Sequence, residues 1–315
     1  MAVCWSPYDD IYMNLALEDL LLNSKGTGRS WLFFYRSQPS IVIGKHQNPW
    51  RECNMPAMQA AGISLARRIS GGGAVYHGPG NLNYCLIMDR DAYDKDQIMA
   101  ALAEAISTLG IAAAVGPRDI LVAGERKFSG TAFCYRRQQV LHHGTLLLDA
   151  DLGCISPLLR PTLEIEESRA IASHPFPVIN LRDCRQELTE EDLVNALADA
   201  LLQVCTEKAC SLETPVFPAA ELLHQRAEEM ALWSWVIGNT PAFELVLDET
   251  NHWQQQPTTL TIRHGIIQQA EAAAELEGAA FTPDALVKVA PGNTFAAALC
   301  NWMNELKLTG STATR

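Results

Sequence analysis

Three consecutive glycines next to two arginines form the strongest chemical signal in the sequence. The segment reads Arg67-Arg68-Ile69-Ser70-Gly71-Gly72-Gly73-Ala74-Val75-Tyr76-His77. Such glycines are poor in the interior of a helix or strand, so they indicate a loop where the backbone approaches something closely. The exposed N–H groups of that loop can line an anionic ligand, to which Arg68 would add a fixed positive charge. The glycines alone fit a flexible hairpin tip equally well, and their spacing matches neither common nucleotide-binding fingerprint.

A lysine beside a Ser-Gly turn is the second signal. The segment reads Glu125-Arg126-Lys127-Phe128-Ser129-Gly130-Thr131-Ala132. A lysine held in this way can direct a compact positive charge at a carboxylate or a phosphate. Because most lysines are solvated surface residues, Lys127 taken alone fits a surface role as well.

The histidines and cysteines do not form a metal-binding pattern. His142 and His143 are adjacent on a predicted strand, where successive side chains face opposite ways, so they cannot both bind one metal from that strand. We expect at least one of them to be structural. The nine cysteines are scattered without a Cys-x-x-Cys pair, which favours reduced thiols over disulfides or a zinc site.

The elements that must position these segments alternate between strand and helix. Asp9 and Asp10 are candidate N-caps for a helix that ends near Ser24. Further helices are predicted over 96–109 and 190–204, and strands over 31–36, 40–44, 64–67, 82–88, 120–122 and 140–148. The first two strands should pair through the turn at Ser37–Pro39, and Lys127 should lie in a loop between the last two.

The last part of the chain has a pattern of its own. Strands are predicted over 243–247 and 258–262, and helices over 281–289 and 294–306, in a small α+β unit that begins between 235 and 245. The sequence therefore predicts an α/β (α+β) protein of two domains, residues 1–238 and residues 239–315.

Charge is distributed unevenly along the 315 residues. The formal net charge is −12, yet residues 1–186 hold 18 basic and 18 acidic side chains, while residues 187–315 hold 6 and 18. This balance excludes a protein that depends on non-specific attraction to nucleic acid. No apolar run is long enough to cross a membrane, and no basic residue precedes Lys25, so we expect neither a membrane span nor a leader peptide, and a cytoplasmic location.

The two signal segments and a third together resemble the lipoate-protein ligase A family. The third is His-His-Gly-Thr-Leu-Leu-Leu-Asp-Ala-Asp-Leu at 142–152, and shorter matches follow the same order at 8–9, 14–18, 42–50, 178–181 and 235–243. The resemblance covers nearly the whole chain, including a small C-terminal accessory domain. It implies a mixed-sheet catalytic domain of the biotin/lipoate ligase type.

The resemblance also implies an activity and its site. Lipoate and ATP, assisted by Mg²⁺, would give lipoyl-adenylate, and the lipoyl group would pass to a lysine of a lipoyl domain, in the E2 subunits of 2-oxoacid dehydrogenases or the glycine cleavage H protein. The ATP contacts it implies are Arg68, Gly73, Ala74, Val75, Tyr76, Asp119 and Lys127. The lipoate contacts it implies are Lys127, Gly72, His77, Ser129, Thr131 and His143, with Asp119 as the metal ligand. The accessory domain would move between the two half-reactions.

Physical chemistry supports a lysine at the centre of such a site. A carboxylate that attacks an α-phosphate is an anion meeting an anion, so a bridging cation is needed, and Lys127 can supply it. The acyl chain needs an apolar channel, for which Val75, Tyr76, Leu146 and Leu148 are candidates.

One position departs from the family pattern. Gly116-Pro117-Arg118-Asp119 stands where the family commonly has Gly-Arg-Asn-Asp, so Arg118 replaces an asparagine. The replacement is either neutral or a sign of altered substrate choice.

Two alternatives remain at this point. One is a cysteine-dependent octanoyl or lipoyl transferase on the same fold, for which Cys154 is the nearest candidate nucleophile. The other is a binder of lipoyl domains that has lost ligation, which the presence of Lys127 disfavours. Because lipoyl domains are usually acidic, we expect an acceptor to approach the neutral part of the chain near Arg68 and Lys127.

Overall fold

The computed structural model describes residues 1–24, 30–165, 168–205 and 217–308. Its largest sheet is mixed and has five strands in the order β1-β2-β6-β11-β10, of which only β1 and β2 run parallel. The strands are β1 (Ala2–Trp5), β2 (Trp31–Tyr35), β6 (Asn81–Asp89), β11 (Gln139–Leu147) and β10 (Thr131–Tyr135). The predicted mixed-sheet α/β class is therefore confirmed.

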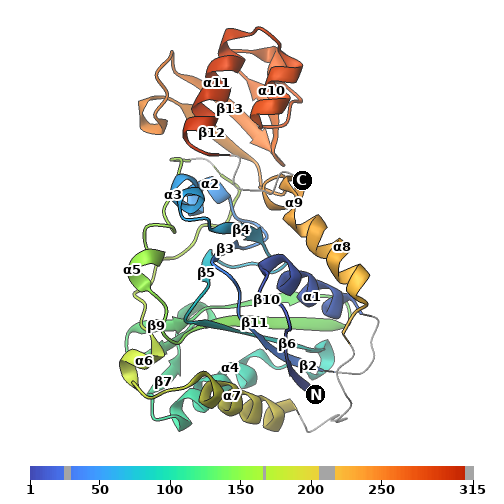
Figure 1. Ribbon diagram of the computed structural model, residues 1–315, viewed down its shortest axis with the longest axis vertical. Coiled ribbons are helices and arrows are strands. Elements are labelled where there is room, and N and C mark those ends of the chain that lie inside the picture. The colour runs from blue at the N-terminus through green and yellow to red at the C-terminus, as the bar shows by residue number, and fades with distance from the viewer. Residues whose placement is uncertain (25–29, 166–167, 206–216, 309–315) are drawn as a thin grey trace.

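Helices cover both faces of this sheet (Figure 1). One face packs on α1 (Ile11–Asn23) and α8 (Ala220–Ala231), and the other on α4 (Lys95–Thr108) and α7 (Glu190–Cys205). Asp10 caps α1 as predicted, because its carboxylate accepts the N–H of Met13 at 2.9 Å. The helix is buried almost all round rather than along one stripe, because both the sheet and α8 pack against it.

Two small sheets carry the candidate site segments. One has the order β4-β3-β5 and comprises β3 (Ser40–Ile43), β4 (Ser64–Arg67) and β5 (Val75–His77). The other comprises β7 (Ala113–Val115), β8 (Leu121–Ala123) and β9 (Arg126–Ser129). Short helices complete this part: α2 (Pro49–Glu52), α3 (Met55–Ala60), α5 (Leu152–Ile155) and α6 (Leu181–Cys184).

The predicted pairing of the strands at 31–36 and 40–44 is wrong. Strand β2 lies in the five-stranded sheet between β1 and β6, whereas β3 lies between β4 and β5. The connecting Gln38 donates its N–H to the carbonyl of Asp9 at 2.8 Å, so the turn is held to the start of α1. Both strands are fully buried, and a continuous apolar run does not indicate which partner a strand will choose.

The C-terminal elements form a separate three-stranded sheet with two helices against it (Figure 1). They are β12 (Phe243–Leu247), β13 (Thr258–Arg263), β14 (Ile266–Ala270), α10 (Pro283–Val289) and α11 (Thr294–Glu305), preceded by the short α9 (Trp233–Val236). Trp50 of α2 joins this unit to the rest, since its buried ring contacts Phe243 and Phe281 and its Nε1 donates to the Leu308 carbonyl at 2.9 Å. None of the described helices is both long and apolar enough to span a membrane.

Candidate active site

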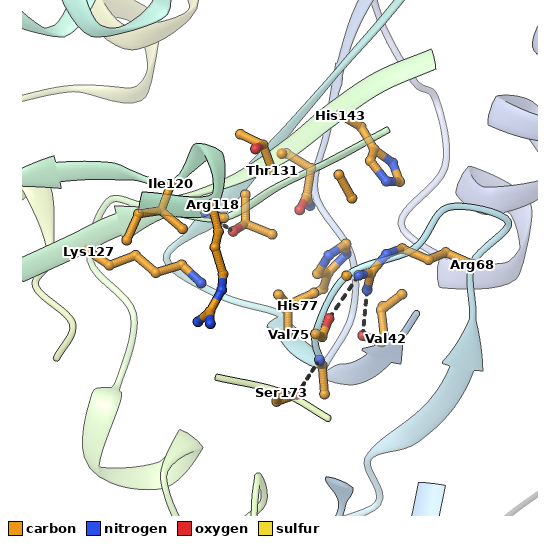
Figure 2. Close-up of a pocket in the computed structure, with 18 of the residues that line it drawn as sticks. Val42, Arg68, Val75, His77, Arg118, Ile120, Lys127, Thr131, His143 and Ser173 are labelled. Atoms are coloured by element: carbon orange, nitrogen blue, oxygen red, sulfur yellow. Dashed lines mark hydrogen bonds between the residues drawn. The ribbon is translucent and has the colours of Figure 1, made fainter. Parts of the chain in front are cut away.

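The glycine-rich loop between β4 and β5 is held by the side chain that precedes it. Arg68 is 4% exposed, and its guanidinium donates to the carbonyls of Val42, Gly71 and Gly73 at 3.0, 2.6 and 2.8 Å. Figure 2 shows this guanidinium turned towards the loop. Because Arg68 attracts the loop carbonyls, the N–H groups can face the other way, and no described hydrogen bond uses those of Gly71, Gly72 and Gly73.

Two glycines allow the loop to lie against β3. Gly72 has a φ of +88°, and a Cβ on Gly44 would overlap its carbonyl oxygen. The close backbone approach predicted for the glycine run is therefore present, and it is made to the end of β3.

Lys127 lies on strand β9 and not in a loop as predicted. Its backbone N–H donates to the Pro177 carbonyl at 2.8 Å, and its carbonyl accepts the N–H of Ile179 at 3.0 Å. These bonds form a short parallel bridge with Val178 that holds the lysine backbone. Burial lowers the pKa of the Lys127 amine, and the positive charge of Arg68 adds to this effect.

Two cavities meet at the Lys127 side chain. The first, here the Arg68 cavity, has a volume of about 380 Å³ and lies against Leu15, Val42 and Arg68. The second, here the Tyr76 cavity, has a volume of about 480 Å³ and lies against Tyr76, Leu147 and Phe176. Both volumes are in the range of small-molecule sites. The residues that border both are Ala74, Val75, Lys127, Gly130, Thr145, Ala172, Ser173 and His174.

The structure brings all but one of the predicted site residues to these cavities. The predicted residues that line only the Arg68 cavity are Arg68, Gly72, Gly73, His77, Thr131 and His143. Those that line only the Tyr76 cavity are Tyr76 and Ser129, and those that line both are Ala74, Val75 and Lys127. Asp119 lines neither, because its carboxylate accepts a hydrogen bond from the Lys95 amine at 2.8 Å. The neighbouring Arg118 lines the Arg68 cavity instead.

The two adjacent histidines face opposite sides of β11, as predicted. His142 is buried between Tyr84, Tyr93 and Phe133. His143 lies in a buried chain of hydrogen bonds, with Nε2 2.7 Å from the Ser70 hydroxyl and Nδ1 2.8 Å from the Glu18 carboxylate. Both ring nitrogens of His143 are thus occupied by protein groups, so its ring shapes the cavity and holds the start of the glycine loop.

His77 differs from these two because one of its ring nitrogens is buried without a hydrogen-bond partner among the described residues. It is 4% exposed, and among the described residues its Nδ1 has no hydrogen-bond partner. Burial lowers the pKa of His77 to about 3, so the ring is neutral at physiological pH. It therefore offers the Arg68 cavity a neutral polar contact.

The prediction that Leu146 and Leu148 line the apolar channel is wrong, because the residues on the cavity side lie one position earlier in the sequence. Leu146 and Leu148 point away from the cavities and pack in the core formed with α4 and α7. Alternation along the strand places Thr145 and Leu147 on the cavity side. The Arg68 cavity takes its apolar lining from Leu15 and Val42 among others, while Val75 and Tyr76 do line cavities as predicted.

The segment 171–178 forms one wall of both cavities, and Val178 was its one residue within a predicted motif. Within it, Ser173 accepts hydrogen bonds from the Ala74 N–H at 2.9 Å (Figure 2) and from Gln47 Nε2 at 3.0 Å. The segment has no strand or helix of its own, and its composition carries no chemical motif. Only its two prolines, Pro175 and Pro177, mark it as a fixed extended stretch.

Cys154 lacks the features of a catalytic nucleophile. Its thiol is exposed and donates to the Asp151 carboxylate at 3.0 Å, and this hydrogen bond raises the pKa of Cys154. A reactive thiolate needs the opposite environment. Cys154 borders neither cavity, so the cysteine-dependent alternative is not favoured.

Comparison with known proteins identifies the family of this chain. The family model described as the lipoyl protein ligase A/B catalytic domain matches residues 10–202. Lipoate-protein ligase A of Blochmanniella floridana is 32% identical over 265 residues, which are 82% of this chain and 79% of that protein.

Two solved structures share the fold. LipL1 of P. falciparum in complex with lipoate has a TM-score of 0.65 at 21% identity and covers 96% of this chain and 99% of that one. A lipoate-protein ligase A bound with ATP has a TM-score of 0.61 at 24% identity and covers 76% of this chain and 100% of that one. On the matched catalytic region and the identity to the Blochmanniella protein, the chain belongs to the lipoyl protein ligase A/B family.

Proposed function

We propose that this protein is an ATP-dependent lipoate–protein ligase. The observation that carries the proposal is the Lys127 amine at the junction of two ligand-sized cavities, where one cation can contact two anionic substrates at once. A lipoate carboxylate oxygen attacks the α-phosphorus of ATP, the bond to the β-phosphate breaks, and pyrophosphate leaves with the electron pair. Lys127 offsets the repulsion between the two anions and the charge that develops on the α-phosphate.

The two cavities suit the two substrates. Lipoate would occupy the Arg68 cavity, where Leu15 and Val42 contact the acyl chain and His77 offers a neutral polar group. The nucleotide would occupy the Tyr76 cavity, where Tyr76 and Phe176 provide aromatic surface for a base. Ala74 and Val75 border both cavities, so the glycine loop would hold the reacting groups in contact.

The lipoyl group would then pass to a protein. The amine of an acceptor lysine in a lipoyl domain attacks the mixed anhydride, AMP leaves, and the amine gives up its proton. We propose E2 subunits and the glycine cleavage H protein as acceptors. Residues 1–186 are neutral in total and residues 187–315 carry −12, so an acidic acceptor is expected to approach the first part, where both cavities lie.

Magnesium would enter with the nucleotide as substrate. Among the described residues, no three His, Cys, Asp or Glu side chains gather in one place, and Asp119, the predicted ligand, is paired with Lys95. These residues do not fit a cage built from protein ligands alone. Mg²⁺ on triphosphates is commonly held through one or two carboxylates and the phosphates, which suits entry as Mg-ATP.

We further propose that residues 1–238 are the catalytic unit and residues 239–315 an accessory unit. The division follows the sheets, because β12, β13 and β14 form a three-stranded sheet of their own. All the residues that line the two cavities precede residue 179.

The deciding assay measures both half-reactions. Purified protein with lipoate and Mg-ATP should release pyrophosphate, and an apo lipoyl domain added afterwards should gain a lipoyl group, seen as a mass increase. Octanoate in place of lipoate gives the acyl preference. Absence of pyrophosphate release with either acid would reject the ligase, and release without transfer would reject the proposed acceptors.

Replacing Cys154 with serine should leave ligation nearly unchanged. The thiol lies outside both cavities and is held by Asp151, so it has no part in the proposed reaction. The measurement is the rate of lipoyl transfer to the acceptor domain. A loss of transfer in the Cys154→Ser protein would favour a thioester-forming transferase.

The pH profile of adenylate formation should reflect the Lys127 amine. Burial lowers its pKa, so as the pH rises it loses its proton before an ordinary lysine does, and the bridging charge is lost with it. We expect kcat/KM for ATP to fall on the alkaline side in the wild type. In Lys127→Arg, whatever its absolute rate, this fall should be absent because arginine stays charged. Identical alkaline limbs in both proteins would contradict the role of Lys127.

A further inference from the structure

The turn η2 (Pro117–Asp119) presents an arginine to the Arg68 cavity from a backbone conformation that arginine rarely adopts. Arg118 has φ and ψ of 57° and 36°, and Asp119 has a φ of 58°, both in the left-handed region. Residues other than glycine are uncommon there, with asparagine and aspartate enriched. An arginine in this uncommon conformation therefore points to a function for its side chain.

The residues that flank Arg118 are held firmly. The Gly116 N–H donates to the Ile120 carbonyl at 2.8 Å, which closes the turn. The Asp119 carbonyl accepts the Thr131 hydroxyl, and the Asp119 carboxylate accepts the Lys95 amine. The turn is therefore anchored to both β10 and α4, and it fixes the point from which the Arg118 side chain extends.

The Arg118 guanidinium itself has no protein partner among the described residues. It lines the Arg68 cavity, and Figure 2 shows it directed to the same region as the Lys127 amine. Arg68 also lines this cavity, but its guanidinium already binds loop carbonyls. No aspartate or glutamate is among the described lining residues, so two unpaired cations face a space without a protein anion.

Arg118 is exposed, so solvent screens its repulsion of Lys127, and two cations that face one space favour an incoming anion able to contact both. The lipoate carboxylate brings one negative charge and is served by Lys127 in the proposed reaction. The triphosphate brings several, and an arginine fork suits phosphate oxygens. We propose that the phosphates of ATP extend from the Tyr76 cavity past Lys127 into the adjoining side of the Arg68 cavity, where Arg118 binds them and holds the departing pyrophosphate as a catalytic residue.

This inference rests on the proposed ligase function and adds a residue to it. It also explains the unusual sequence at this position, because Arg118 replaces a residue better suited to the turn with one that carries a charge. We therefore expect Arg118→Asn to fit the turn better than arginine does and to bind phosphate more weakly.

The test compares Arg118→Asn and Arg118→Lys with the wild type and with Arg137→Asn, which removes an exposed arginine at the remote β10–β11 turn. In Arg118→Asn, KM for ATP should rise roughly tenfold or more, as expected for the loss of a charged hydrogen bond. KM for lipoate should stay within about twofold. Arg118→Lys should be intermediate, Arg137→Asn should match the wild type, and the melting temperature of Arg118→Asn should equal or exceed that of the wild type.

Calorimetric titration with inorganic pyrophosphate and Mg²⁺ gives a readout that needs no turnover. Pyrophosphate should bind Arg118→Asn roughly tenfold or more weakly than the wild type. Unchanged affinity for pyrophosphate, a loss confined to KM for lipoate, or a lowered melting temperature with all constants impaired alike would each overturn the proposal. If the wild type forms no lipoyl-adenylate, the ligase function fails, while the titration still decides whether Arg118 binds phosphate.

Discussion

Replacing Lys127 with alanine should abolish the formation of lipoyl-adenylate. The amine lies where the two cavities meet, and no other lysine lines either of them among the described residues. Removal of one preorganised group that stabilises developing charge costs roughly 100-fold to 1,000-fold in rate, and here the same group also brings two anions together. The measurement is pyrophosphate release with lipoate and ATP in a single-turnover assay.

Two controls make this result specific. Lys288→Ala removes an exposed lysine from α10 of the C-terminal unit. This lysine lines neither cavity, so the variant should match the wild type. Circular dichroism of Lys127→Ala should show the native fold, because the backbone bonds of Lys127 with Pro177 and Ile179 do not involve its side chain. Normal turnover in folded Lys127→Ala would overturn the mechanism.

Replacing Arg67 with leucine should produce the largest loss of stability that we expect from a single change. Arg67 is 1% exposed and donates to the carbonyls of Val236, Gly44, Lys45 and Gln47 at 2.7, 3.2, 3.1 and 2.8 Å. It also donates to the hydroxyl of Thr240 at 3.1 Å. Leaving several buried acceptors without a donor should lower the free energy of unfolding by about 3 kcal/mol or more. Urea unfolding followed by tryptophan fluorescence measures this.

The matched control is Arg263→Leu, an exposed arginine at the end of β13. It should change the free energy of unfolding by no more than about 0.5 kcal/mol. Because β4 leads directly into the glycine loop, Arg67→Leu should also weaken ATP use. An equal, small loss of stability in both variants would show that the Arg67 network contributes little.

Helices and strands were predicted correctly where residues close together in the sequence determine them. Three examples are the cap at Asp10, the strand that carries His142 and His143, and the helix predicted over 96–109, which ends before Gly110 with its φ of +80°. Each follows from residues within one turn or one strand. Most of the candidate site was also predicted, because the glycine loop and the Lys127 segment each have a distinctive composition.

Features set by distant contacts were not predictable in this way. Strand β3 pairs with β4 and β5 and not with its neighbour in sequence, and the backbone of Lys127, which pairs with Val122 of β8, is also held by Pro177 and Ile179, about 50 residues away. The assignment of Leu146 to the channel failed for a simpler reason, since a slip of one residue reverses the face of a strand. Ser173 could not be found from composition, because its role depends on Ala74 and Gln47.

The meeting of two cavities at Lys127 has a consequence for how such an enzyme can change. Leu15, Val42 and Ala132 border only the Arg68 cavity, whereas Leu147 and Phe176 border only the Tyr76 cavity. A mutation in the first group can alter the preferred acid without retuning nucleotide use, and the reverse holds for the second. Lys127 serves both substrates and has no such freedom. Acid preference can therefore drift between lineages through single substitutions while the energy source of the reaction stays constant.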